Sequence, residues 1–183
     1  LRRQRQMCIR DSHYGDGSGV RGDIIGDTQH HGGNDKAVYA YSREELDYWQ
    51  SELSRPLASG GFGENLTTQG IDLSALLINQ RVCIGTAVLE VSVPRQPCAT
   101  FAGWLGERGW LKRWTARGDC GTYLRIISPG RIRPGDTIEL DAPPSHDITM
   151  RMAFAVKMGD RALAQRVIDA RYLPAHQQNS LRT

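Results

Sequence analysis

Residues 87–98, which read AVLEVSVPRQPC, decide how this part of the chain is expected to fold. The apolar run at 87–93 has the aliphatic and β-branched composition of a strand. Two prolines in the next four positions end that strand, because proline has no backbone N–H to donate and cannot continue a helix. Cys98 is therefore held at a rigid strand exit near Arg95. A cation beside a thiol favours the thiolate, which binds soft metals or attacks electrophiles.

Other short strands are expected on both sides of this one. Their composition is β-branched or aromatic, and turn-forming sequences such as Ser128-Pro129-Gly130 separate several of them. The predicted strands are 37–41, 76–78, 81–84, 87–93, 122–127 and 137–140. Residues 99–116 are expected to form one helix, whose aromatic side chains we interpret as core. Short strands with an inserted helix favour a mostly β fold that resembles a barrel.

Two further helical regions are predicted outside these strands. Ser42 and Glu45 have the spacing of a capping box, so a helix should begin there and continue to about Leu53. After Pro143-Pro144 the chain loses glycine and becomes helical in pattern. We interpret 145–172 as a helical hairpin that packs on the barrel, with a substrate lid as the alternative.

The composition limits the classes of function. The chain has 183 residues and a net charge of +3, and residues 1–12 alone contain four arginines and one aspartate. The rest of the chain is balanced in charge, which gives no argument for a nucleic-acid or anionic membrane surface. No apolar run is long enough to span a membrane. We expect residues 1–12 to be a non-native extension, 13–141 a barrel domain with a truncated start, and 145–183 a helical tail.

The cysteines outside that extension are Cys83, Cys98 and Cys120. Their number is odd, and they lack the paired spacing of zinc sites. Without a secretory signal, reduced thiols in a cytoplasmic protein are the simplest interpretation.

Five motifs together resemble a known family. In chain order they are Gly22-Asp23, HGGNDKA at 31–37, GFGENL at 61–66, PRQPC at 94–98 and Gly135-Asp136. The same order is seen in MOSC domains, which are named after the C-terminal domain of molybdenum cofactor sulfurases. The resemblance covers roughly residues 19–141, and it is closest to the stand-alone bacterial branch that includes the hydroxylaminopurine reductases. The predicted helical tail is similar to the three-helix extension of that branch.

The resemblance implies a molybdenum cofactor of the molybdopterin type, with Cys98 as the metal ligand. The alternative for Cys98 is a small buried hydrophobic residue, which is how most free cysteines behave. The cofactor ends in a phosphate, which arginine, lysine and glycine amides are suited to bind. The predicted cofactor-binding residues are Arg95, Gly32, Gly33, Lys36, Gly61, Gly63 and Arg125. Surface ion pairs, solvated loop positions or tight turns are the structural alternatives for them.

Three polar residues complete the predicted catalytic set with Cys98. His31 has a side chain that can relay a proton near neutral pH. Asn65 offers both a donor and an acceptor to a ligand. Glu64 is expected either to accept a proton or to brace its own loop.

The expected function is reduction of N-hydroxylated small molecules, such as hydroxylaminopurines or amidoximes. No flavin or nicotinamide motif is visible, so a separate reductase would have to supply the electrons. One alternative is a sulfur carrier or cofactor-binding module that uses a Cys98 persulfide. Another is a cysteine hydrolase with His31 as its base. The sequence leaves the oligomeric state open.

Overall fold

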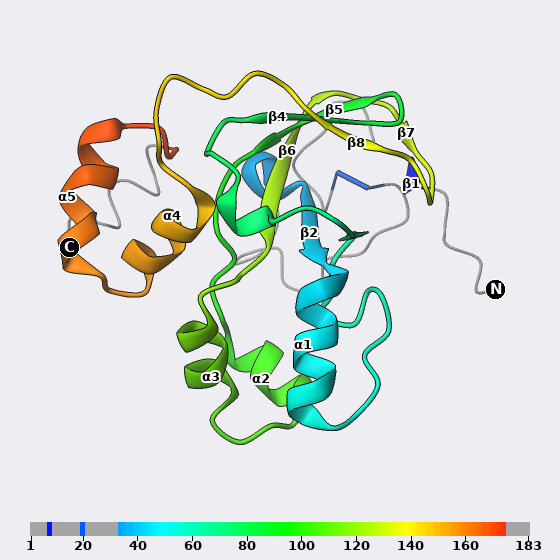
Figure 1. Cartoon of the computed structure of the whole chain (residues 1–183), viewed down its shortest axis with the longest axis vertical. Coiled ribbons are helices and arrows are strands. Elements are labelled where there is room, and N and C mark those ends of the chain that lie inside the picture. The colour runs from blue at the N-terminus through cyan, green and yellow to red at the C-terminus, as the bar shows by residue number, and fades with distance from the viewer. Residues whose placement is uncertain (1–6, 9–18, 21–32, 175–183) are drawn as a thin grey trace.

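A computed structural model describes residues 7–8, 19–20 and 33–174 of the chain. Figure 1 shows a curved sheet with three helices, α1 to α3, at one end and a pair, α4 and α5, at its side. The described elements are β1 (Met7–Cys8), the 3₁₀ turn η1 (Asn34–Lys36), β2 (Val38–Ser42), α1 (Arg43–Leu53), β3 (Leu66–Thr68), the 3₁₀ turn η2 (Leu73–Ala75), β4 (Arg81–Ile84), β5 (Ala87–Val91), α2 (Ala99–Leu105), α3 (Trp110–Arg117), β6 (Thr122–Ser128), β7 (Arg131–Ile132), β8 (Ile138–Leu140), α4 (Met150–Lys157) and α5 (Arg161–Ala170).

The main sheet has six strands in the order β3-β2-β6-β5-β4-β8. The pair β2–β3 is parallel and the other pairs are antiparallel, so the sheet is mixed. Side chains from well-separated strands, including Leu66, Val82, Leu124 and Ile138, line one apolar pocket inside the curve. The prediction of a mostly β, barrel-like fold is confirmed, in the form of a half-barrel.

The predicted strand exit is present at the end of β5. Beyond Val91 the pairing with β6 continues for two residues, because the Ser92 N–H donates to the Tyr123 carbonyl at 3.0 Å and the Tyr123 N–H donates to the Val93 carbonyl at 3.1 Å. Pro94 has no N–H to extend this ladder. The chain then leaves the sheet, and α2 begins directly after Cys98.

Helix α1 begins and ends where the sequence predicted. The Ser42 side chain accepts a hydrogen bond from the Glu45 N–H at 3.2 Å. The prediction that Glu45 completes a capping box is wrong, however, because the Glu45 carboxylate pairs with Arg117 of α3. A charged partner on another helix outcompetes the local backbone donor.

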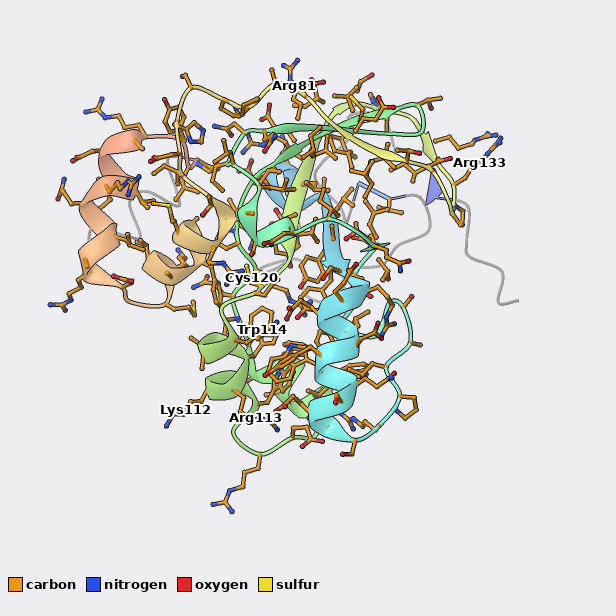
Figure 2. The ribbon with its side chains drawn as sticks, viewed as in Figure 1. Arg81, Lys112, Arg113, Trp114, Cys120 and Arg133 are labelled. Carbon is orange, nitrogen blue, oxygen red and sulfur yellow. The ribbon has the colours of Figure 1, made fainter. Side chains whose placement is uncertain are left out.

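The prediction of one helix over 99–116 is also wrong. The chain breaks into α2 and α3. Gly106 ends α2 with φ 72° and Gly109 precedes α3 with φ 71°, both in the left-handed region that favours glycine. The core interpretation of the aromatic residues is confirmed for Phe101, Trp110 and Trp114, which are buried. Figure 2 shows Trp114 inside this region, whereas Lys112 and Arg113 lie on the outside.

One predicted strand is absent at residues 76–78. These residues instead follow the turn η2, with a single bridge between Leu77 and Thr149. The Ile78 N–H donates to the Ile148 carbonyl at 3.0 Å, so this segment fastens the C-terminal part to the sheet. The predicted helical hairpin is confirmed: α4 and α5 contact each other beside the sheet (Figure 1). None of the helices in the described ranges combines the length and hydropathy that crossing a bilayer requires.

Candidate functional site

Cys98 lies between the strand exit and α2, as the sequence predicted. It is the N-cap of α2, with φ −131° and ψ 162°, and its Sγ accepts the Phe101 N–H at 3.4 Å. The side chain is half-buried and packs against the edge of the core. The thiol group is therefore fixed in direction by the backbone and still reachable from outside.

Arg95 is held firmly, three residues before Cys98. Its guanidinium carbon lies 4.6 Å from the centre of the Tyr39 ring and 4.5 Å from that of Phe101. Its Nη1 donates to the Phe62 carbonyl. Among the residues that the structure describes, no carboxylate forms an ion pair with this side chain. A half-buried cation without a counter-charge favours an anion next to it.

Two tyrosines support this cation from the sheet. The Tyr39 hydroxyl donates to the Cys120 carbonyl at 2.9 Å, and the Tyr39 and Tyr123 rings are 5.1 Å apart. Burial raises the pKa of Tyr39 well above its ordinary value. Burial also raises the pKa of Tyr123, with Arg95 acting in the opposite direction. Both phenols are therefore protonated at neutral pH.

Cys120 lies in the same region but differs from Cys98 in its surroundings. Figure 2 shows it in the interior, where the chain enters β6. Burial raises its pKa above the ordinary thiol value, and the side chain is 1% exposed. Cys120 therefore remains a neutral thiol within the core.

Glu64 braces its own loop and the start of β3. Its Oε1 accepts the Gly60 N–H at 2.6 Å and the Thr67 hydroxyl at 2.9 Å, and its Oε2 accepts the Phe62 N–H at 2.9 Å. The side chain is 7% exposed. Glu64 was expected either to accept a proton or to brace its loop, and these contacts agree with the second role.

The same loop is held from its other side by Arg95. Glu64 binds the Phe62 N–H while Arg95 binds the Phe62 carbonyl, so opposite charges fix one peptide segment. The glycines allow the tight turn: Gly63 has φ 79°, and a Cβ on Gly61 would lie 2.6 Å from the Ala58 carbonyl oxygen. For Gly61 and Gly63 the turn alone is a sufficient reason.

Asn65 connects this loop to the sheet. Its N–H donates to the Tyr39 carbonyl and its Oδ1 accepts the Tyr39 N–H, both at 2.8 Å. The side chain thereby extends the parallel pairing of β2 and β3 by one rung. Asn65 thus holds the strand that presents Tyr39 to Arg95.

Arg125 belongs to an ion network of the sheet. It pairs with Asp35 and with Glu90, each at 2.9 Å, and Nη1 also donates to the Asn79 side chain at 3.2 Å. Because Asp35 lies in η1, Arg125 fastens that turn to β6. The expected cofactor contact of Arg125 competes with these three partners.

Lys36 stands at the end of the same turn, beside Gly33 with φ 87°. Burial lowers the pKa of Lys36, and Asp35 opposes that shift. Burial lowers the pKa of Lys157 at the end of α4, and the charge of Lys36 lowers it further. The two ammonium groups are therefore within electrostatic reach of each other. His31 and Gly32 lie outside the described residues.

The structure thus joins Cys98, Arg95, Glu64 and Asn65 through shared aromatic and backbone contacts. Sequence analysis missed the residues that connect them, which are Tyr39, Phe62 and Phe101. Their aromatic character was visible, but nothing in the local sequence indicated that three separate segments would surround one guanidinium.

A family comparison agrees with this arrangement. The MOSC domain family matches residues 27–139, a range that contains Cys98, Arg95 and the 60–66 loop. The chain belongs to the MOSC domain family.

The MOSC assignment is supported by curated relatives. An uncharacterized Bacillus subtilis protein, YflK, is 36% identical over 160 residues, covering 84% of this chain and 66% of that protein. YiiM of Escherichia coli is 30% identical over 141 residues, covering 75% of this chain and 62% of that protein. A Gibberella moniliformis protein named "Reductase" is 33% identical over 131 residues, covering 64% of this chain but 22% of that protein. This chain spans less than two thirds of the length of these relatives.

A solved structure has a similar fold. The crystal structure of YiiM from Geobacillus stearothermophilus superposes with a TM-score of 0.75 at 28% identity, covering 82% of this chain and 78% of that one. The chain is therefore related to YiiM and YflK in both sequence and fold.

The donor set of this MOSC chain bears on the kind of metal centre it would fit. The described ranges contain no group of three or more His, Cys, Asp or Glu side chains placed to hold a metal ion. Cys98 is a single soft donor, three residues after a cation for which the described ranges provide no ion-paired carboxylate. Such a site suits a metal whose other ligands come from an anionic cofactor, and the residues present therefore fit a molybdenum pterin.

Proposed function

We propose that this MOSC protein binds a molybdenum cofactor of the molybdopterin type through Cys98 and reduces N-hydroxylated small molecules. The observation that carries the proposal is that half-buried Cys98 lies three residues after Arg95, a cation that forms no ion pair with a carboxylate in the described part of the chain. A structural cysteine needs neither outside access nor a cation beside it. An anionic metal centre needs both.

The cofactor, when bound, supplies the two-electron redox chemistry. The chain's own contribution is the thiolate ligand and its surroundings. Arg95 stabilises negative charge near the sulfur, while Tyr39 and Phe101 prevent its guanidinium from moving away. Glu64 and Asn65 hold the loop and the strand that keep these groups in place.

We propose that Lys36 contributes positive charge toward the phosphate of the cofactor. Burial lowers the pKa of its ammonium group, and an anion beside that group would favour the charged form. Lys157 adds a second ammonium group from the helical pair, in reach of the first. The two lysines together support an anion-binding role for this region.

The electrons are proposed to come from a separate reductase. No flavin or nicotinamide motif is visible in the sequence. The related Gibberella protein named "Reductase" has most of its length outside the match with this chain. In that protein the MOSC-like part is one portion of a larger reductase, which supports reduction as the class of reaction.

The test is turnover of a hydroxylaminopurine by metal-loaded protein with a chemical reductant in place of the partner. The wild type should form the amine, and Cys98→Ser should not, because a neutral hydroxyl is a poor ligand for a soft metal. Cys83→Ser is the matched control, since Cys83 lies in β4 with its sulfur near the Asp141 carboxylate. Cyanide-labile sulfur on Cys98 without turnover would instead favour a sulfur carrier.

A further inference from the structure

Tyr123 is an unexplained polar group at the candidate site. It lies in β6 and faces the same side of the sheet as Arg125. The side chain is half-buried, and its ring packs against Tyr39, the residue that supports Arg95. Tyr123 therefore borders the same group of residues as Cys98.

The backbone of Tyr123 is fixed on every side. Its N–H donates to the Val93 carbonyl, and its carbonyl accepts from the Ser92 N–H, the Ser92 hydroxyl and the Thr122 hydroxyl. These contacts tie it to the segment that leads to Cys98. The position of the phenol relative to the strand exit is thus set by the sheet itself.

The Tyr123 hydroxyl differs from that of its neighbour. Tyr39 uses its hydroxyl to bind the Cys120 carbonyl, whereas no described residue forms a hydrogen bond with the hydroxyl of Tyr123. It also does not belong to the buried polar atoms that lack a partner. A hydroxyl to which the described residues make no hydrogen bond can serve a ligand.

We propose that the Tyr123 hydroxyl contacts the N-hydroxyl oxygen of the substrate and delivers a proton to it. This role rests on the proposed function and adds the residue that handles the leaving oxygen. Reduction of an N-hydroxylated base breaks the N–O bond and consumes two electrons from the partner reductase and two protons. The products are the amine and one water molecule. Tyr123 supplies one proton to the departing oxygen and regains it from solvent, which also supplies the other proton.

The electrostatics of the site agree with a proton donor. Burial raises the pKa of Tyr123. Arg95 opposes that shift, whereas Cys98 and Cys120 add to it. The raised pKa keeps the phenol protonated at neutral pH. The effect of Cys98 also indicates that its sulfur is within electrostatic reach of the phenol.

The first experiment compares Tyr123→Phe with wild type and with Tyr48→Phe. Tyr48 lies in α1, where its ring contacts Trp49 and Arg117, outside this group of residues. Unfolding midpoint and molybdenum content should be the same in all three proteins. Tyr123→Phe should lower kcat about 10²- to 10⁴-fold, the usual contribution of a general acid, while KM changes little. The alkaline fall in kcat should be present in the wild type and in Tyr48→Phe only.

The second experiment needs no cofactor. Ultraviolet absorbance of the phenolate is titrated with pH in the apoprotein, and subtraction of the Tyr123→Phe curve isolates Tyr123. Its midpoint should move down in a Cys98→Ala background, because the negative sulfur that opposes phenolate formation is gone. An unchanged midpoint would show that the two groups are too far apart and would overturn the proposal.

The two hypotheses fail in different ways. Normal turnover by Tyr123→Phe would refute the role of Tyr123 and leave the reductase function intact. A fully loaded wild type without turnover would refute the reductase function, and the proton-donor role with it. A loss of kcat accompanied by lower metal content or stability would assign Tyr123 to structure and would also refute the proposal.

Discussion

Replacing Glu64 by glutamine tests whether this residue braces the loop or takes part in the reaction. The carboxylate accepts from Gly60, Phe62 and Thr67. Glutamine retains one oxygen, so it can keep the two bonds on Oε1 in neutral form, and its NH₂ group then faces the Phe62 N–H. A buried donor left without an acceptor costs about 1–3 kcal/mol, and weakening two charge-assisted bonds adds about 1 kcal/mol. The expected loss is about 2–4 kcal/mol.

Urea unfolding of Glu64→Gln measures this loss directly. For a chain of this size the loss corresponds to a fall in Tm of roughly 5–15 °C. Glu44→Gln is the control, because Glu44 accepts a single bond from the exposed Gly70 N–H, which glutamine can also accept. If Glu64→Gln is as stable as wild type but loses turnover, the brace interpretation is wrong and Glu64 acts in the reaction.

Three further predictions concern stability, pH dependence and thiol reactivity. Arg125→Met should cost about 1–3 kcal/mol in urea unfolding, because half-buried Asp35 loses its cation and Glu90 keeps only the longer pair with Arg81 at 3.7 Å. Arg166→Met on an exposed pair should cost under about 1 kcal/mol, and equal costs would contradict the network. Burial raises the pKa of Asp119, so its ionisation opposes folding. Asp119→Asn should therefore be more stable than wild type above the ordinary aspartate pKa and lose that advantage in more acidic buffer, and a difference independent of pH would refute this. Iodoacetamide should modify Cys98 in the folded protein but Cys120 only after unfolding, as judged by mass spectrometry of the peptides; fast labelling of Cys120 in the folded state would contradict its burial.

Local signals in the sequence predicted much of the fold. The prolines after residue 93 mark where pairing with β6 stops, and Ser42 marks the start of α1. Both depend on the chemistry of one or two neighbouring residues. Gly106 and Gly109 are equally local, but their effect was outweighed in our interpretation by the aromatic pattern that runs across them.

The errors elsewhere have a different origin. Glu45 was expected to bind its own helix end, and it binds Arg117, a residue 72 positions away. The parallel pairing of β2 with β3 also depends on contacts between distant segments. Such partners are set by the tertiary arrangement, which propensity and spacing do not contain.

In the candidate site, too, local motifs were predictable and contacts between distant segments were not. Cys98 and Arg95 could be selected from the sequence because both stand in one short motif. The contacts that hold Arg95 in place could not be predicted from the sequence, because Tyr39, Phe62 and Phe101 come from three separate segments. Glu64 and Arg125 were recognised as polar residues of interest, but their partners became visible only in the folded chain.

The central claim is that the Cys98 sulfur holds a molybdenum centre, and metal analysis tests it most directly. Protein produced in a molybdenum-replete host should contain stoichiometric molybdenum in the wild type and in Cys83→Ala. Cys98→Ala should lose most of that metal while keeping the folded circular dichroism spectrum of the wild type. Equal molybdenum in Cys98→Ala and wild type, or none in either, would contradict the account.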